Sequence, residues 1–160
     1  MNNIDFNIRK LKEEDLDEVA KLYTLFWGDK MNLYKMKEKF LQISQDDKYI
    51  FLVAEKDQNI VGTIQGIICE ELYGECFPFL VMENFVVDEN HQGNGIGRKL
   101  LYELERIGMQ KNCSQIVFIT ESDRKDTVKF YEKGDRPLEF VTTRQWFVKL
   151  LEHRDALREL

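Results

Sequence analysis

Apolar residues follow two kinds of spacing in the first half of the chain, and each predicts a different element. Residues 5–9 alternate between polar and apolar side chains, and three longer stretches are almost continuously apolar, which is typical of strands. Two other stretches carry apolar residues at intervals of three and four, which predicts helices packed on a sheet. The predicted strands are 5–9, 49–54, 60–69 and 77–87. The predicted helices are 13–26 and 33–43, and 70–76 is a loop.

The second half begins with a polar, glycine-rich turn and continues into a third helical pattern. Its apolar stripe is formed by Ile96, Leu100, Leu101, Leu104 and Ile107, and charged residues occupy the opposite face. The elements that follow are a strand at 116–120, a short helix at 126–133, strands at 138–142 and 145–150, and a charged helical tail at 151–160. This order predicts an α/β (α+β) fold, with a mixed, mostly antiparallel sheet of about seven strands and helices on both faces.

The turn after the central strand has the composition of an anion-binding site. Glycines at 93, 95 and 97 separate the apolar run that ends at Val87 from the helix. Glycine lets a backbone approach a ligand closely, and the first N–H groups of a helix are unpaired and favour phosphate. The dinucleotide pattern G-x-G-x-x-G fails, since Arg98 or Leu100 stands where its last glycine belongs, and the nucleotide P-loop pattern also fails.

The pattern that does fit is Q-x-x-G-x-G, formed by Gln92, Gly95 and Gly97. Together with the preceding residues 83–88 (ENFVVD) and the following 98–101 (RKLL), it resembles the acetyl-CoA pyrophosphate loop of the GNAT superfamily of N-acetyltransferases. The resemblance implies the GNAT (acyl-CoA N-acyltransferase) fold, acetyl-CoA as cofactor, and acetyl transfer to a primary amine.

The resemblance also implies how the cofactor would be held. Backbone N–H groups of the turn would bind the pyrophosphate, with charge added by the first helical residues, and the pantetheine arm would lie along the end of the central strand. That strand would carry a bulge and splay from 116–120, and the N–H of Phe85 or Val86 would face the acetyl carbonyl and stabilise an oxyanion. The implied cofactor-binding residues are Phe85, Val86, Val87, Gln92, Gly93, Asn94, Gly95, Ile96, Gly97, Arg98 and Lys99.

Two side chains are the predicted catalytic groups. Glu83 is a carboxylate within an apolar strand, where desolvation would raise its pKa and suit it to act as a base on the amine, directly or through a water held by Asn84. Tyr131, in the sequence Phe-Tyr-Glu-Lys at 130–133, matches the tyrosine that donates a proton to the departing thiolate in the family. Arg124 and Thr127 depart from the family pattern, so a contact from this helix to the pantetheine arm is left open.

The acceptor site is expected between the first two helices, the loop at 70–76 and the final strands. We predict an aromatic and acidic pocket for a cationic amine, which would belong to a small molecule, a polyamine, an aminoglycoside-like compound or a protein. Its residues would be Trp27, Asp29, Tyr34, Glu71 and Tyr73.

Composition narrows the class of partner. The 160 residues suit one domain, predicted at 1–150, and the net charge of −6 without a basic patch argues against nucleic acid. Three scattered cysteines and two histidines lack metal-ligand spacing, so we expect free thiols and no metal. No stretch is long and apolar enough for a membrane span or signal peptide. The sequence therefore predicts a cytoplasmic protein, for which the resemblance allows a homodimer.

Two other functions remain open at this level. A non-catalytic acyl-CoA-binding or sensing module would use the same glycine turn, and the presence of both Glu83 and Tyr131 favours the enzyme. A different nucleotide-binding enzyme, such as a phosphotransferase, is disfavoured by the missing P-loop lysine pattern.

Overall fold

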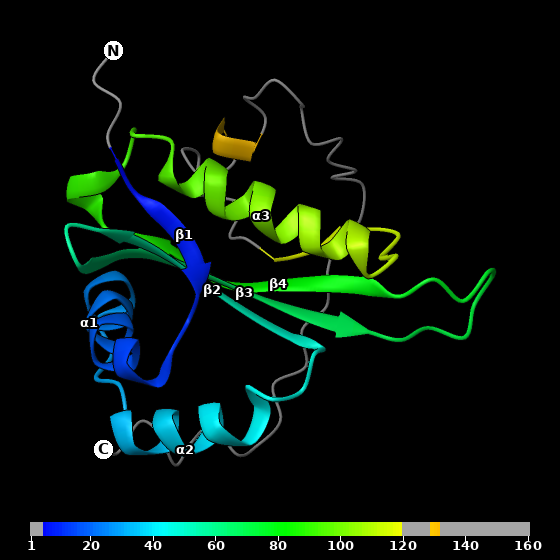
Figure 1. The fold of residues 1–160 in the computed structure, drawn as a ribbon, viewed down its shortest axis with the longest axis horizontal. Coiled ribbons are helices and arrows are strands. Elements are labelled where there is room, and N and C mark those ends of the chain that lie inside the picture. Colours follow the sequence, from blue (N-terminus) through cyan, green and yellow to red (C-terminus); the bar gives the residue numbers. More distant parts are fainter. Residues whose placement is uncertain (1–4, 120–128, 132–160) are drawn as a thin grey trace. The chain divides into compact units, whose positions relative to one another are not determined.

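The computed structural model describes residues 5–119 and 129–131, and its principal feature is one mixed sheet (Figure 1). The five strands follow one another across the sheet in the order β1-β2-β3-β4-β5. Each neighbouring pair from β1 through β4 is antiparallel, and β5 runs parallel to β4. The strands are β1 (Asn7–Lys10), β2 (Tyr49–Lys56), β3 (Asn59–Cys69), β4 (Phe79–Val87) and β5 (Ile116–Val117). The helices are α1 (Leu16–Trp27), α2 (Leu33–Ile43) and α3 (Ile96–Gln110), with short 3-10 turns at Glu13–Asp15 and Glu89–His91.

The mixed, mostly antiparallel sheet is confirmed, with five strands described where about seven were predicted. The last predicted strands, 138–142 and 145–150, and the tail at 151–160 lie outside the described residues. Of the predicted helix at 126–133, residues 129–131 are described and are helical. The chain divides into two units, Met1–Ile119 and Thr120–Leu160.

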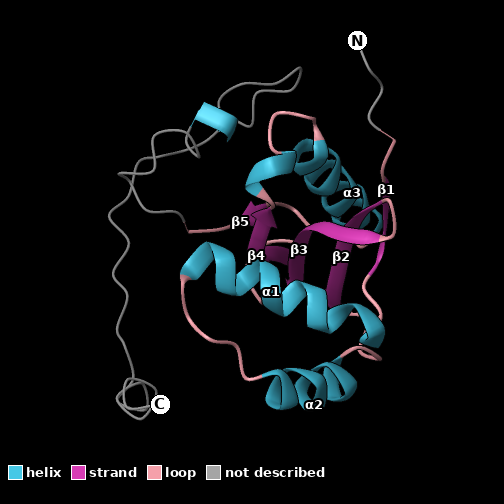
Figure 2. Cartoon of the chain, turned by 90° about the vertical axis from the view of Figure 1, so that its left-hand side faces the viewer, coloured by secondary structure: helices cyan, strands magenta, loops and turns pink. Residues whose placement is uncertain are grey.

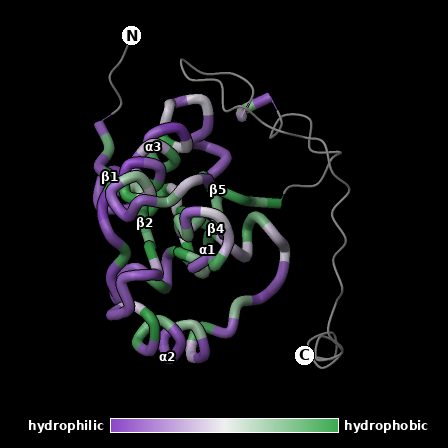
Figure 3. Tube along the Cα trace, turned by 90° about the vertical axis from the view of Figure 1, so that its right-hand side faces the viewer, coloured by the Kyte–Doolittle hydropathy of each residue, from purple (hydrophilic) through white to green (hydrophobic). Residues whose placement is uncertain are grey.

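Alternation along β3 places helices on opposite faces of the sheet, as Figure 2 shows for α1 and α3. On one face, Val19 and Leu22 of α1 form a buried cluster with Val53 and Ile60. On the other face, α3 packs over the glycines of β3. In Figure 3 hydrophobic residues gather along the strands, whereas the helices carry both hydrophobic and hydrophilic residues, so the core lies on either side of the sheet.

Two glycines in β3 let α3 approach the sheet closely. A Cβ at Gly66 would lie 2.6 Å from Cδ1 of Leu104, and one at Gly62 would lie 3.2 Å from Cδ1 of Leu100. Both leucines are fully buried. A larger side chain at either glycine would therefore force α3 away from the sheet.

An ion pair between the half-buried Arg9 and the buried Asp15 fixes the start of α1 to strands β1 and β2. The Arg9 guanidinium donates to both carboxylate oxygens of Asp15, at 2.7 and 2.8 Å, and also to Glu55 of β2. Asp15 further accepts the Lys12 N–H at 2.8 Å. These bonds, Arg9 first, hold the pKa of the buried Asp15 carboxyl below its usual range. The helix predicted from residue 13 accordingly begins as a 3-10 turn and becomes α-helical at Leu16.

Candidate active site

The central strand β4 carries a β-bulge. Thr63 pairs with Val86, but Gln65 pairs with Glu83, so β4 has one extra residue between these two points. Within the bulge Asn84 has φ of 51°, a left-handed conformation that asparagine adopts more readily than most residues. The bulge expected from the family resemblance is thus present.

A hydrogen bond to β3 indicates which backbone groups at the end of β4 face that strand. Asp88 donates its N–H to the Val61 carbonyl of β3 at 2.9 Å. Because successive N–H groups of a strand point to opposite edges outside a bulge, the N–H of Val86 also faces β3, and that of Val87 points to the opposite edge of β4. Of the two donors predicted for the acyl carbonyl, Val86 thus faces β3, whereas Phe85 lies next to Asn84 within the bulge.

Strand β5 accompanies only the first part of β4. Ile116 pairs with Leu80 and Val117 pairs with Val81, and the two residues that follow are not part of a strand. The predicted strand 116–120 is therefore shorter in the described part of the chain. Beyond Val81 the described part of β5 does not follow β4, which agrees with the splaying expected beside the bulge.

The glycine turn leads directly into the N-terminus of α3. Gly93 and Gly95 have φ of 76° and 81°, and a Cβ at either would meet nothing within 4 Å. Gly95 is the N-cap and provides no side chain, so the N–H groups of Ile96 and Gly97, at the start of the helix, have no acceptor within it. Open space, backbone donors and the positive end of the helix dipole suit an anionic group here.

Side chains of the turn bond back to the backbone. The Gln92 amide donates to the Val87 carbonyl at 3.1 Å, and the Asn94 amide donates to the His91 carbonyl at 3.2 Å. These bonds fix the turn's path without using the helix N-terminal N–H groups. Gln92 and Asn94, predicted as cofactor-binding residues, therefore also shape the loop.

The two cations after the turn differ in position. Lys99 is exposed and its ammonium lies 4.6 Å from the centre of the Phe6 ring, a cation–π contact that directs it toward the N-terminal strand. Arg98 is half-buried in the first turn of α3. Phosphate contact from Lys99 would require it to leave Phe6.

The predicted base and acid lie in different surroundings. Glu83 is exposed, so the burial expected of it is wrong; it lies opposite Gln65 and hence on the α1 side of the sheet. Tyr131 is 6% exposed, and burial raises the pKa of its hydroxyl to about 12. Its ring makes an edge contact with Phe130, with 5.2 Å between centres. Tyr131 therefore stays protonated at neutral pH.

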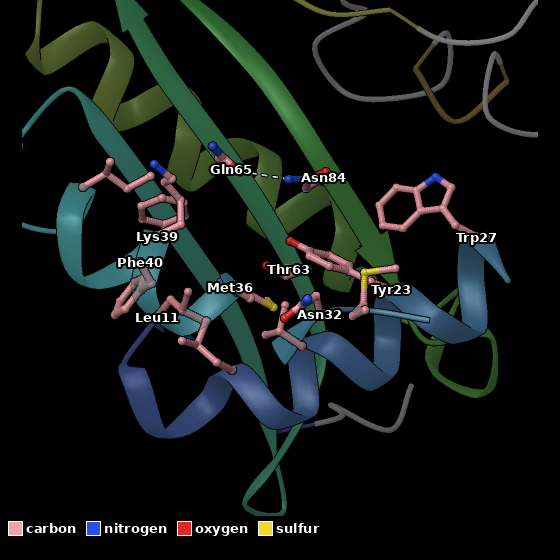
Figure 4. A pocket seen from close by; sticks show the side chains of 15 residues that line it. Leu11, Tyr23, Trp27, Asn32, Met36, Lys39, Phe40, Thr63, Gln65 and Asn84 are labelled. Carbon is pink, nitrogen blue, oxygen red and sulfur yellow. Dashed lines mark hydrogen bonds between the residues drawn. The ribbon is translucent and has the colours of Figure 1, made fainter. Parts of the chain in front are cut away.

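A cavity of about 440 Å³ lies between α1, α2 and the face of the sheet that α1 covers (Figure 4). Its size is in the range of small-molecule sites. The lining residues are Leu11, Leu16, Val19, Tyr23, Trp27, Met31, Asn32, Met36, Lys39, Phe40, Ile43, Phe51, Thr63, Gln65 and Asn84. Because Asn84 belongs to the bulge, the cavity reaches the part of β4 where the cofactor is predicted to lie.

Hydrogen bonds join the polar side chains in the cavity. The Asn84 amide donates to the Gln65 side-chain oxygen at 2.9 Å, and Figure 4 shows this bond crossing from β4 to β3. Thr63 donates to the Leu52 carbonyl at 3.1 Å and is hydrogen-bonded to Tyr23. Burial raises the pKa of Tyr23 to about 12, so this hydroxyl is neutral in the physiological range.

Of the five predicted acceptor residues, only Trp27 lines this cavity. Asp29 follows the end of α1, Tyr34 is 77% exposed, and Glu71 and Tyr73 lie in the β3–β4 loop at the far end of the hairpin in Figure 1. The sequence missed Asn32, Gln65 and the inward face of α2. The periodic Met36 and Phe40 were visible, but which face of α2 meets the sheet is decided by tertiary packing.

Two absences apply to the described residues alone. None of the helices there is both long and apolar enough to cross a bilayer. No cluster of three or more histidine, cysteine or acidic side chains there could hold a metal ion.

Comparison with known sequences identifies the domain type. The model of the acetyltransferase (GNAT) family matches residues 18–134, which is most of the chain. Glucosamine 6-phosphate N-acetyltransferase 1 of Dictyostelium discoideum is 30% identical over 99 residues, covering 60% of this chain and 61% of that protein. Short fragments also match valine–tRNA ligases, as in Salinispora tropica, with 78% identity over 23 residues. The chain spans 3–4% of those ligases, so they say nothing of its activity.

Solved structures share the fold at low sequence identity. A GNAT family acetyltransferase of Staphylococcus aureus superposes with a TM-score of 0.72 and 21% identity, covering 91% of this chain and 98% of the other. AAC(6')-Iy, solved with a CoA-containing bisubstrate analog, gives a TM-score of 0.68 and 17% identity, covering 89% and 99%. Both identities are low enough that the likeness concerns the fold.

Proposed function

We propose that this chain, which belongs to the acetyltransferase (GNAT) family, transfers the acetyl group of acetyl-CoA to a primary amine. The supporting observation is the continuity of β4, from a bulge at Asn84 to a glycine turn and an uncapped helix N-terminus. On one stretch of backbone, this order places the Val87 N–H, which points away from β3, near the N–H groups at the start of α3, which suit an anion. The predicted cofactor residues at 85–87 and 92–98 lie along it.

Bound acetyl-CoA would supply an acyl thioester, and side chains of the protein would accept and donate the protons. Glu83, on the α1 side of the sheet opposite Gln65, takes the proton of the amine directly or through a water. The nitrogen–carbon bond forms, the carbon–sulfur bond breaks, and the Tyr131 hydroxyl donates its proton to the thiolate. The raised pKa of Tyr131 keeps that proton in place at neutral pH.

One observation favours a second candidate, a non-catalytic acyl-CoA-binding module. Glu83 is exposed, whereas the base role was predicted for a carboxylate enclosed by an apolar strand. The glycine turn would bind the same cofactor in a sensing protein. Turnover therefore separates the two functions, and binding alone does not.

The first experiment is thermal unfolding with acetyl-CoA, using ATP and NAD as controls. Acetyl-CoA at about one hundred times its Kd adds ~2.7 kcal/mol of stability, which is a shift of roughly 5–10 °C for this size. A shift with acetyl-CoA alone supports the cofactor. Equal shifts with ATP or NAD, or none in a folded sample, would refute it.

Turnover is then measured as release of free thiol with a panel of amines. We expect Glu83→Gln and Tyr131→Phe each to lower kcat about 100-fold, the lower end of general acid–base contributions. Retained acetyl-CoA binding in both variants is the control. Binding without turnover on any amine would favour the sensing module.

Partners and location follow from the same proposal. The acceptor is a small molecule or a protein amine, with no role for nucleic acid or membrane, and the protein works in the cytoplasm. A homodimer remains part of the proposal. Light scattering at several concentrations would test the homodimer.

A further inference from the structure

The charge of the acceptor cavity differs from the sequence prediction. Among its lining residues in the described part of the chain there is no carboxylate and one cation, Lys39. Lys39 is exposed, and its ammonium donates to the neutral amide of Gln42 at 2.7 Å. Apart from Glu83, which is assigned to the reacting amine, the described surroundings of the cavity offer no counter-charge to a polycation, and Lys39 repels one at the α2 side.

The other polar groups of the cavity are neutral. Because Asn84 donates to Gln65, this pair keeps one amide oxygen and one NH2 group for a ligand. An amine can donate to that oxygen, on the strand that carries Glu83. The amine end of an acceptor is thus best placed beside the bulge.

Apolar and aromatic side chains provide the remaining walls. Leu11, Trp27, Met36 and Phe40 are distributed around the cavity in Figure 4. Such walls bind hydrocarbon or ring atoms and gain nothing from a second ammonium group. An apolar body with one amine matches them.

We infer that the acceptor is a primary amine on an apolar or aromatic body without a second positive charge, and that Lys39 favours an anionic substituent on that body. This inference rests on the proposed function. The inference disfavours two of the acceptor classes that the sequence left open, polyamines and aminoglycoside-like compounds, because both carry several positive charges.

Kinetics with three matched acceptors test the inference. Phenylethylamine has one amine, phenylalanine adds a carboxylate, and 4-(aminomethyl)phenylethylamine adds a second amine. We expect the diamine to have the lowest kcat/KM and phenylalanine to gain about two- to fivefold from Lys39, the range for an exposed ion pair. Lys39→Gln should remove this gain and Lys39→Glu should reverse the order.

Lys35→Glu is the control, because it changes the net charge equally and Lys35 is an exposed α2 residue outside the cavity lining. It should leave the order of acceptors unchanged. A reversal by Lys35→Glu as large as that by Lys39→Glu would assign the effect to overall charge and overturn the role of Lys39. A preference for the diamine, or for spermidine, would overturn the substrate class.

Calorimetric titration of the same amines, with and without CoA, keeps the test independent of turnover. Binding of the monoamines and not of the diamine supports the inference even if no thiol is released, in which case only the proposed enzyme activity fails. Absence of binding by all three amines to folded protein would overturn the assignment of the cavity.

Discussion

The cofactor side and the acceptor cavity of this protein are built from different parts of the chain. The cofactor side uses backbone groups from one continuous stretch, β4, the glycine turn and the start of α3. The cavity uses side chains from two helices, three strands and their connections. A backbone site depends on local conformation, whereas a side-chain site depends on which elements pack together, so the two should respond to different substitutions.

The largest expected effect concerns the support of the acceptor side, the Arg9–Asp15 ion pair before α1. Asp15→Asn leaves the half-buried Arg9 guanidinium with Glu55 as its carboxylate partner and weakens the acceptor of the Lys12 N–H. It should cost about 2 kcal/mol, or roughly 4–8 °C in Tm. Glu14→Gln, in an exposed pair with Lys12, is the control and should change Tm little. An equal Tm for both variants would contradict this account.

The same pair predicts a pH dependence. The pKa of Asp15 is lowered in the folded protein, so its contribution is complete above the ordinary value of 3.8 and is lost as the pH falls through the folded value. Hydrogen exchange below pH 4 should therefore show α1 losing protection before α3. Simultaneous loss would mean that the two sides do not differ in this way.

The next effect concerns the cofactor side. Gly95→Ala places a side chain at φ of 81° and should raise the Kd for acetyl-CoA about tenfold, the equivalent of ~1.4 kcal/mol of left-handed strain. Gly74→Ala, at φ of 59° in the β3–β4 loop, carries similar strain far from the turn and should leave that Kd unchanged. Isothermal titration measures both.

A smaller effect is expected in the cavity. Trp27→Ala removes part of its wall and should raise the KM for the amine about fivefold, the equivalent of ~1 kcal/mol. Tyr34→Ala, an exposed α2 residue outside the lining, is the matched aromatic control. Kinetics in which Tyr34→Ala had the larger effect would restore the acceptor site predicted from the sequence.

The smallest effect should appear where both sides meet, at Asn84. Asn84→Gly keeps the left-handed conformation but loses the bond to Gln65, and should raise the KM for the amine about twofold. Asn84→Ala loses the same bond and adds strain, so it should also weaken acetyl-CoA binding. If both variants bind acetyl-CoA equally, the bulge does not depend on residue 84.

The local features of the cofactor side could be predicted from the sequence, whereas the packing around the acceptor cavity could not. The glycine turn could be predicted because glycines such as Gly93 and Gly95 adopt left-handed conformations by their own local geometry. The bulge was expected from the family resemblance. The exposure of Glu83 could not be predicted, since it depends on what covers the strand. Asp29 and Glu71 were expected to make the pocket acidic, yet the packing of α2 on the sheet brought Lys39 and Asn32 to it instead.

The close packing of α3 on β3 has a consequence for the length of the ligand. Gly66 sets how near the middle of this helix lies to the sheet, and the first turn of the same helix holds the predicted phosphate site. The height of that first turn above the sheet therefore depends on the thickness of the core beneath the helix. A buried glycine, in contact with no ligand, would in this way determine which length of acyl carrier reaches the reacting strand.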